Sequence, residues 1–410
     1  MSNSLPGGFL IPVLFGALVG HVALTVTTLN VLYGQGAAPR WVLRVVRVIH
    51  DLWMLLGTPW LAWLCYRSGL LETGNWRALP ALLQAYLAVA AFTGWFVVPG
   101  VALRRARRRL PAAQLSNHGR TVDIAARLGR RPIGRGPHRM MVRWPANEQF
   151  KLEILEKTYC LPRVPAAWDG LSILHLTDMH FTGTVGQEYF EQVIDEANRL
   201  DWDLVAVTGD LVDRPSCFDW VPRLLGRLRS RLGAYAILGN HDRWYDADRV
   251  RRDLAGIGFH LIAGRWELLD VKGHPFVVAG TETPWMGRMP DLSAAPPDAF
   301  RLLLSHTPDN IDWAALQGID LMLAGHNHGG QVRLPIIGPV FMPSRYGRKF
   351  DVGAFQVGPT LCYVSRGVSG KHPFRFGCKP ELTKIVLVST SSFDREPQAC
   401  ASASGPLSLG

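Results

Sequence analysis

Two pairs of metal-binding side chains occur in this 410-residue chain, each directly after a short apolar run. Asp178 and His180 follow "LSILHLT", and His326 and His328 follow "LMLAG". Carboxylates and imidazoles together suit divalent manganese, iron or zinc, whereas soft copper prefers sulfur. The two pairs therefore predict a metal centre, and such centres activate water for hydrolysis.

Three other apolar runs end on a donor of the same kind, at Asp210, Asn240 and His306. In open α/β sheets, ligands bind outside the carboxyl ends of the strands, so all these donors are expected to form one cluster. The two residues of each pair are expected to lie in extended backbone, where side chains two positions apart point the same way. His175 lies inside its apolar run and is expected to be a satisfied core histidine.

The elements that must position this cluster are short strands and amphipathic helices. Apolar runs such as "DLVAVTGD" and "FRLLLSH" are typical of strands that are covered on both faces. Between the runs, stretches such as "GQEYFEQVIDEANRL" carry apolar residues at the spacing of helices. This alternation predicts an α/β domain with much of its sheet parallel.

Five motifs occur in the order "DMH", "GDLVD", "GNHD", "SH" and "GHNH". The series resembles the pattern of the calcineurin-like metallophosphoesterases over residues 150–390, and its last part is similar to the bacterial branch of membrane-associated phosphodiesterases. The resemblance implies a four-layer αββα sandwich with two divalent metal ions, which are Mn, Fe or Zn. The sequence leaves the identity of the ions open.

By the same resemblance, the seven expected metal ligands form two sets that share one bridging carboxylate. They are Asp178, His180 and His328 for the first ion, Asn240, His306 and His326 for the second, and Asp210 between them. A hydroxide that bridges the ions is expected to attack phosphorus. His241 is expected to protonate the leaving group, and Asp213 to orient His241. Six nearby residues are candidate substrate contacts: Asp242, Arg243, Trp244, Tyr245, Lys371 and His372.

The first 103 residues have the composition of a membrane region, with only five basic and two acidic residues. Helices are expected at about residues 8–33, 48–66 and 78–103. The first and third contain uncharged stretches that exceed the roughly 20 residues needed to cross a bilayer. The middle one has 15 uncharged residues, so two or three spans are possible, and three are favoured. No basic residue precedes the first stretch, which favours an anchor over a cleaved signal peptide.

Arginine dominates residues 104–150, with twelve Arg against Asp123 and Glu148. The cluster "RRARRR" directly after an apolar stretch predicts a cytoplasmic location for the cluster and for the chain beyond it. Anionic headgroups explain this cluster with fewer assumptions than nucleic acid, so membrane lipids are expected partners and nucleic acid is not. We expect a juxtamembrane linker at residues 104–150, a catalytic domain at 151–390 and a disordered tail at 391–410.

These features predict a multi-pass inner-membrane enzyme with its catalytic domain on the cytoplasmic side. It would hydrolyse a phosphodiester or pyrophosphate bond, and a lipid-linked phosphate ester is the natural substrate for an enzyme held at a membrane. Two alternatives stay open: a membrane scaffold or partner-binding protein on the same fold, and a nuclease or protein phosphatase with the same metal core. The complete set of ligands and the acid argue against a scaffold. The six cysteines show no paired spacing and predict neither a disulfide framework nor a zinc ribbon.

Overall fold

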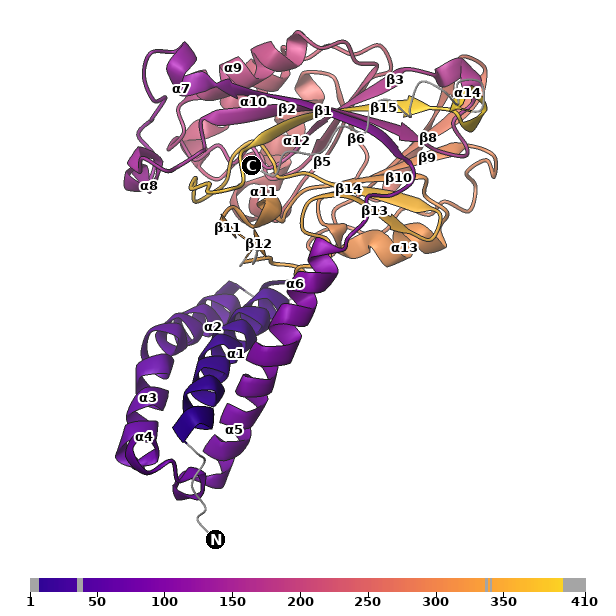
Figure 1. Ribbon diagram of the computed structural model, residues 1–410. Coiled ribbons are helices and arrows are strands. Elements are labelled where there is room, and N and C mark those ends of the chain that lie inside the picture. The colour runs from indigo at the N-terminus through magenta and orange to yellow at the C-terminus, as the bar shows by residue number, and fades with distance from the viewer. Residues whose placement is uncertain (1–6, 35–39, 336–337, 340, 394–410) are drawn as a thin grey trace. The chain divides into compact units, whose positions relative to one another are not determined.

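The chain divides into two compact units, each of which is described by itself. The helical unit contains residues 1–109 and 336–348, and the α/β unit contains residues 110–335 and 349–410. The computed structural model describes residues 7–34, 40–335, 338–339 and 341–393 (Figure 1). Of the disordered tail expected at residues 391–410, residues 391–393 belong to the short helix α14 (Thr390–Phe393). Residues 394–410 lie outside the described residues.

The helical unit contains three helical stretches that are long and apolar enough to cross a membrane, at Phe9–Gly34, Arg44–Arg67 and Ala81–Ala106. The first lies in α1 (Gly7–Gly34). The second runs through α2 (Arg40–Leu52), a π-helical turn (Trp53–Gly57) and α3 (Thr58–Arg67). The third runs through α5 (Ala81–Phe92), a second π-helical turn (Thr93–Val97) and α6 (Val98–Ala106). Between the second and third stretches lie α4 (Leu70–Thr73) and a 3₁₀ turn (Trp76–Ala78). The middle stretch is therefore helical over a spanning length, although its uncharged core is short.

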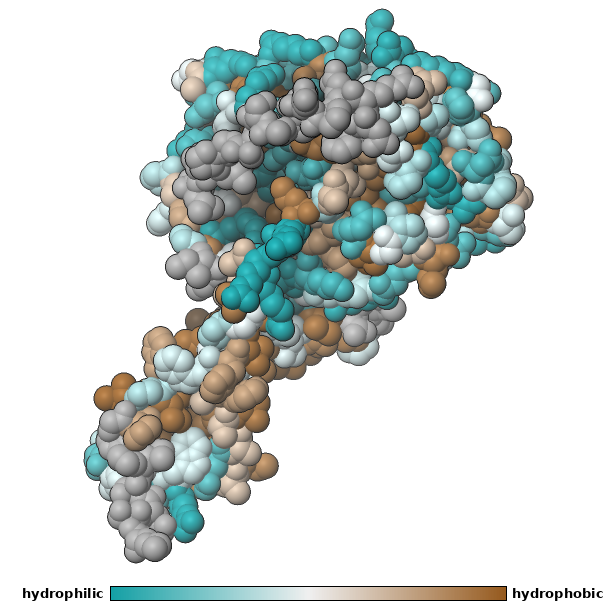
Figure 2. All heavy atoms as spheres, turned by 45° about the vertical axis from the view of Figure 1, so that its right-hand side comes forward, coloured by the Kyte–Doolittle hydropathy of each residue, from teal (hydrophilic) through white to brown (hydrophobic). Residues whose placement is uncertain are grey.

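Small residues bring the helices of this unit together, while large apolar side chains face outward. A Cβ on Gly20 of α1 would lie 1.7 Å from the carbonyl oxygen of Ala90 in α5, so only glycine fits at this crossing. Ile11 and Leu82 are 74% and 88% exposed, and Figure 2 shows hydrophobic residues across the surface of this unit. Small residues between helices and apolar residues outside are typical of helices that face lipid.

Residues 336–348 belong to the helical unit although they come late in the sequence. They include the short strand β12 (Gly338–Pro339). The backbone N–H of Met342 donates to Asn30 Oδ1 at 2.9 Å, near the C-terminal end of α1. A Cβ on Gly338 would lie 2.6 Å from the guanidinium of Arg105, near the C-terminal end of α6. The segment therefore contacts the C-terminal ends of both helices.

Two mixed sheets form the centre of the α/β unit (Figure 1). The first has the order β1-β2-β15-β3-β4-β5-β6, and the second has the order β13-β14-β10-β9-β8-β7. The first contains β1 (Gln114–Asp123), β2 (Lys151–Cys160), β3 (Leu171–Leu176), β4 (Leu204–Thr208), β5 (Ala234–Ile237), β6 (Phe259–Leu261) and β15 (Glu381–Val388). The second contains β7 (Arg265–Val271), β8 (His274–Thr281), β9 (Phe300–Ser305), β10 (Leu321–Ala324), β13 (Gly353–Val357) and β14 (Thr360–Val364), and the two-residue strand β11 (Arg333–Leu334) lies outside both sheets. Strands β3, β4 and β5 are parallel neighbours, as are β8, β9 and β10, so their carboxyl ends share an edge.

The two sheets pack face to face and are covered by helices. Ile173 and Leu204 of the first sheet share a buried cluster with Leu302 and Leu321 of the second. The other face of the first sheet packs against α9 (Gln187–Asn198), α10 (Trp220–Leu225) and α12 (Ala247–Gly256). Helix α13 (Ile311–Leu316) contacts β13 and β14 of the second sheet. The four-layer αββα arrangement expected from the sequence is confirmed.

Residues 110–150 of the arginine-rich segment belong to the α/β unit and residues 104–109 to the helical unit, so the segment does not form the separate linker expected at residues 104–150. Strand β1 pairs antiparallel with β2, and Ile124, at the start of α7 (Ile124–Arg127), is fully buried. Arg120 and Arg127 form ion pairs with Glu196 of α9, whose side chain is also fully buried. One buried carboxylate thus holds both arginines, as well as Arg199, within the fold, and the boundary expected at residue 150 moves to residue 110. Helix α8 (Arg139–Arg143) completes this segment.

Candidate metal centre

The five expected ligands that follow β3, β4 and β10 all lie in left-handed backbone. Their φ angles are 54° at Asp178, 45° at His180, 57° at Asp210, 66° at His326 and 49° at His328. Residues with a Cβ adopt this conformation rarely, at a cost of about 1–3 kcal/mol each, and such residues concentrate at functional sites. The extended backbone expected for the two pairs is wrong, because β3 and β10 end before them. Left-handed turns position the side chains instead.

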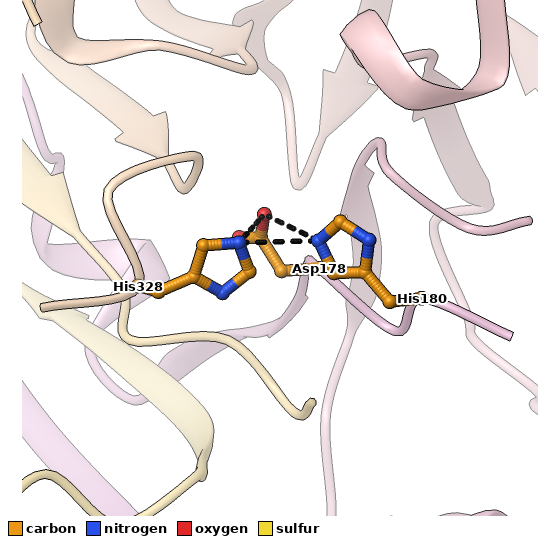
Figure 3. Close-up of side chains that lie close together, drawn as sticks. All are labelled: Asp178, His180 and His328. Atoms are coloured by element: carbon orange, nitrogen blue, oxygen red, sulfur yellow. Dashed lines mark hydrogen bonds and ion pairs between the residues drawn. The ribbon is translucent and has the colours of Figure 1, made fainter. Parts of the chain in front are cut away.

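Asp178, His180 and His328 form one group whose ligand atoms converge (Figure 3). Asp178 Oδ1 lies 3.7 Å from His180 Nε2 and 3.4 Å from His328 Nε2. The two imidazole nitrogens are 3.1 Å apart. The structure therefore brings together, from the ends of a strand in each sheet, the three residues expected to hold the first ion.

Asp210, His306 and His326 form a second group. His306 Nε2 lies 3.1 Å from Asp210 Oδ2, and the rings of His306 and His326 are 5.2 Å apart between centroids. Asp210 Oδ2 also lies 3.6 Å from His180 Nε2 of the first group. The Asp210 carboxylate thus lies between the two groups.

Asn240, the remaining expected ligand, begins α11 (Asn240–Tyr245) and is 5% exposed. The backbone on either side of Asn240 contacts the carboxylate of Asp210, the expected bridging ligand. A Cβ on Gly239 would lie 2.1 Å from Asp210 Oδ1, and the N–H of His241 donates to the same oxygen at 2.8 Å. The loop that carries Asn240 therefore packs directly against Asp210.

The buried atoms of these groups fit divalent ions. Among the described residues, Asp178 Oδ1, Asn240 Oδ1 and His306 Nε2 have no hydrogen-bond partner, although all three atoms are buried. A buried polar atom without a partner costs about 1–3 kcal/mol, and a bound cation removes that cost for a lone pair. Imidazole nitrogen with carboxylate and amide oxygen is a donor set that suits Mn, Fe or Zn.

The outer nitrogens of two ligand imidazoles are held by oxygen acceptors. His180 Nδ1 donates to Asp213 Oδ2 at 2.5 Å, and His306 Nδ1 donates to the carbonyl oxygen of Thr208 at 2.6 Å. These bonds fix the proton on Nδ1 and leave the lone pair of Nε2 directed into the site. Both rings are therefore oriented as metal ligands.

The carboxylates of the site favour the protonated, positively charged form of two of its imidazoles. Burial alone lowers the pKa of His180, but the carboxylates of Asp213 and Asp178 raise it to about 10. Burial likewise lowers the pKa of His306, but the carboxylate of Asp210 outweighs this effect and raises the pKa to about 9. At His328 burial prevails and lowers the pKa to about 3. A divalent cation would supply the positive charge that protons otherwise bring.

His241 and Asp213, the expected acid and its orienting residue, are in contact. His241 Nδ1 lies 2.5 Å from Asp213 Oδ1, so the two oxygens of this carboxylate bind His241 and His180 separately. Burial alone raises the pKa of Asp213, but the two imidazoles hold it well below its usual value. The His241 side chain is 14% exposed, whereas that of Asp213 is 1% exposed. His241 can therefore reach a substrate while Asp213 stays behind it.

Asp242 was a candidate substrate contact, and this expectation is wrong. Its side chain is fully buried. Its two oxygens accept hydrogen bonds from the backbone N–H groups of Asp210, Leu211, Val212 and Gly239 at 2.8–3.1 Å. Asp242 thus ties the Asp210 loop to the Asn240 loop. The sequence held one signal for this role, because an acidic side chain in the first turn of a helix can accept hydrogen bonds from free backbone N–H groups at the helix start.

Of the other candidate contacts, Arg243 is exposed on α11, and Trp244 packs on His241. The Trp244 ring lies 4.5 Å from that of His241, and Lys371 Nζ lies 5.4 Å from the centre of the Trp244 ring. Tyr245 and Lys371 line a cavity beside Asp213, and the ring of His372 packs against His138.

Two further residues at the site were not foreseen. Arg375 is fully buried and donates to the carbonyl oxygen of His328 at 3.3 Å. Trp285 packs on His326 at 4.8 Å between ring centroids. Neither lies in a recognisable motif, so only the folded chain reveals them.

Comparisons with known proteins agree with this geometry. The profile of the family described as calcineurin-like phosphoesterase matches residues 171–330, which include every expected metal ligand. The chain is 33% identical over 255 residues to the Bacillus subtilis protein named "Uncharacterized metallophosphoesterase YkuE", covering 60% of this chain and 88% of that protein. It is 29% identical over 221 residues to "Phosphodiesterase YaeI" of Escherichia coli, covering 53% and 82% of the two chains. A "Transmembrane protein with metallophosphoesterase domain" from Bos taurus is 30% identical over 253 residues, which cover 55% of this chain and 54% of that protein. The chain therefore belongs to the calcineurin-like metallophosphoesterase family and is a metal-dependent hydrolase of phosphate esters.

Proposed function

We propose that this enzyme is a membrane-anchored phosphodiesterase or pyrophosphatase that works with two divalent ions. The observation that carries the proposal is the pair of ligand groups, which meet at Asp210 and contain three buried atoms without a hydrogen-bond partner among the described residues. The proposed ligands are Asp178, His180 and His328 for one ion, Asn240, His306 and His326 for the other, and Asp210 for both.

The proposed chemistry divides between the ions and the protein. Bound divalent ions supply positive charge for the phosphate oxygens and lower the pKa of a coordinated water. His241 supplies the proton that the leaving group requires, because its Nδ1 is bound to Asp213 and its Nε2 remains for the substrate. Asp213 also fixes His180, so one carboxylate orients both a ligand and the acid.

The proposed setting is the cytoplasmic face of a membrane, with a lipid-linked phosphodiester or pyrophosphate as substrate. Three apolar helical stretches of spanning length support the anchor. Five arginines at residues 104–109 lie at the C-terminal end of the third stretch, and the positive-inside rule favours a cytoplasmic location for a cluster of this kind. The names of two relatives, a phosphodiesterase and a transmembrane protein, support the same combination of a phosphodiesterase and a membrane anchor.

The test of the reaction uses full-length protein in detergent, stripped with a chelator and reloaded with Mn²⁺ or Zn²⁺. Hydrolysis of bis(p-nitrophenyl) phosphate is compared with that of p-nitrophenyl phosphate, and a faster reaction with the diester is expected. Asp210→Asn should abolish both metal-dependent activities, because it removes the carboxylate shared by the two groups. The matched control is Asp219→Asn, whose side chain is 67% exposed. Full activity of Asp210→Asn would refute the two-ion proposal.

The lipid and the membrane side require separate measurements. A nucleoside diphosphate lipid should be hydrolysed faster than the same nucleoside diphosphate head group without its lipid, when the enzyme is in nanodiscs. Equal rates for the lipid and for its free head group would refute a lipid-linked substrate and would indicate that a membrane-anchored enzyme acts on a soluble one. A periplasmic reporter fused after Arg109 is expected to be silent, and a strong signal would reverse the proposed orientation.

A further inference from the structure

A cavity of about 500 Å³ lies beside the Asp213 carboxylate, and the proposed roles of the metal ligands and the acid do not use it. Its volume is within the range of about 300–1,000 Å³ typical of small-molecule sites. The lining comes from separate parts of the sequence and includes Arg135, Thr182, Asp213, Arg214, Tyr245 and Lys371. The cavity is therefore large enough for a phosphate together with an attached group.

The charge of this lining is positive. Arg135, Arg214 and Lys371 bring three cationic side chains. Among the described lining residues Asp213 is the acidic one, and both of its oxygens are already bound by His180 and His241. Arg214 donates to the backbone carbonyl of Arg135 at 3.3 Å, and this neutral acceptor does not offset the charge of the guanidinium. A concave surface with an excess of one charge concentrates ligands of the opposite charge.

One wall of the cavity comes from the arginine-rich segment, and this wall is fixed to the metal-site loop. Ile133 pairs with Val185 in an antiparallel bridge. The N–H of Gly136 donates to the carbonyl oxygen of Gly183 at 2.7 Å, and a Cβ on Gly136 would lie 2.3 Å from the nitrogen of Thr184. Arg135 is thus held against the chain three to five residues beyond His180. It precedes the region that the family profile matches.

The cavity lies on the side of the acid. Asp213 lines it and binds His241 directly. Lys371 lines it as well, and it lies over Trp244, whose ring packs on His241. The cations that line the cavity therefore lie on the side of the site that carries His241.

We propose that this cavity binds a phosphate carried by the leaving group, so that the preferred substrate contains a pyrophosphate bond. This inference rests on the proposed function. In the reaction, the oxygen of water bonds to phosphorus and the P–O bond to the leaving group breaks. The leaving oxygen takes a proton from His241, and the proton that water releases restores His241 through solvent. The three cations offset the negative charge of the departing phosphate.

The first test compares two substrates in the full-length, metal-loaded enzyme. A nucleoside diphosphate sugar has a leaving group that keeps a phosphate, whereas bis(p-nitrophenyl) phosphate does not. The double variant Arg135→Gln/Arg214→Gln is expected to lower kcat/KM for the first substrate by about 10–100-fold, because charge-assisted bonds to phosphate are lost, and to leave the second unchanged. The control is Arg223→Gln, an exposed arginine of α10 outside the cavity lining.

An equal effect on both substrates, or no effect on either, would overturn the inference. Failure of the wild-type enzyme to hydrolyse either substrate would instead count against the proposed function, so the two failures are distinguishable. Thermal unfolding of each variant shows whether the fold is intact.

The second test needs no metal and no turnover. Binding of inorganic phosphate to the chelator-treated full-length protein is measured by calorimetry. Wild type and Arg223→Gln should bind phosphate with the same affinity, the double variant about tenfold or more weakly, and added salt should weaken binding in wild type. Absence of binding in wild type, or equal binding in the double variant, would refute a phosphate site in this cavity.

Discussion

Replacing Asp213 with Asn would separate the two functions of this carboxylate. Its oxygens accept at 2.5 Å from Nδ1 of His180 and of His241, and its side chain is 1% exposed. An asparagine offers one acceptor oxygen, and its NH₂ group must then face the other imidazole. That imidazole has to rotate or move its proton from Nδ1 to Nε2. At His180 this change removes the lone pair expected to bind metal, and at His241 it disturbs the proton donor.

The size of the effect follows from the bond that is lost. A buried hydrogen bond to a charged group contributes about 1.5–3 kcal/mol. This free energy corresponds to a factor of about 10–100 in an equilibrium or rate constant. The loss of the outer partner of a metal-binding histidine typically has an effect of about the same size, 10–100-fold. Asp213→Asn is therefore expected to weaken metal binding or slow the reaction by about 10–100-fold.

The assay separates these two outcomes in full-length protein. Mn²⁺ titration reports the dissociation constant, and kcat is compared between phenyl and p-nitrophenyl esters of the same phosphate. A defect at His180 raises the dissociation constant. A defect at His241 slows the phenyl ester more than the p-nitrophenyl ester, because the better leaving group depends less on protonation. With Asp219→Asn as control, a folded Asp213→Asn enzyme with wild-type metal affinity and a wild-type rate on the phenyl ester would refute the reasoning.

Three further predictions concern stability. Asp242→Asn is expected to lower the free energy of unfolding by about 1.5–3 kcal/mol, because an amide NH₂ would face backbone N–H groups. Urea titration measures this free energy, and the control variant Asp248→Asn, with a side chain 81% exposed, should leave it unchanged. Mn²⁺ at about 100 times its dissociation constant should stabilise the protein by about 2.7 kcal/mol, seen as a higher Tm than after chelation. The same Tm in both states would contradict metal binding by the two groups. Burial lowers the pKa of His175 to about 4, so the unfolded chain binds the extra proton between pH 6.5 and 4 and stability falls as the pH drops through this window. His175→Gln should reduce that slope by up to about 1.4 kcal/mol per pH unit, and an unchanged slope would show that His175 is not the group responsible.

The strands and most ligands could be predicted because their signals are local. Buried strands such as β3 and β10 are uninterrupted apolar runs, and the donors follow them directly. Strand β1 gives no such signal, because most of its side chains are exposed and it lies at the edge of its sheet. Its place is decided by pairing with β2 and by the contact between Arg120 and the distant Glu196.

The local geometry of the site could not be predicted, because distant loops determine it. The backbone N–H of Asp178 donates to the carbonyl of Gly209 at 3.0 Å, and that of His180 donates to the carbonyl of Asp210 at 2.9 Å. His326 N–H donates to Asp178 Oδ2 at 3.0 Å. These long-range bonds hold the ligands in the left-handed conformation, which the spacing of two residues cannot reveal.

The contacts of residues 336–348 bear on whether the chain crosses a membrane an odd or an even number of times. Near the C-terminal end of α1, Asn30 binds Met342, and near the C-terminal end of α6, Arg105 lies against Gly338. Both helix ends therefore face the same side if these helices cross a bilayer, and the chain between them must cross an even number of times. On that condition the stretch through α5 and α6 would provide one crossing, and the stretch Arg44–Arg67 would have to provide the other. The total, including α1, would then be three crossings, and the loop between residues 67 and 81 would lie on the opposite side of the membrane from residue 110.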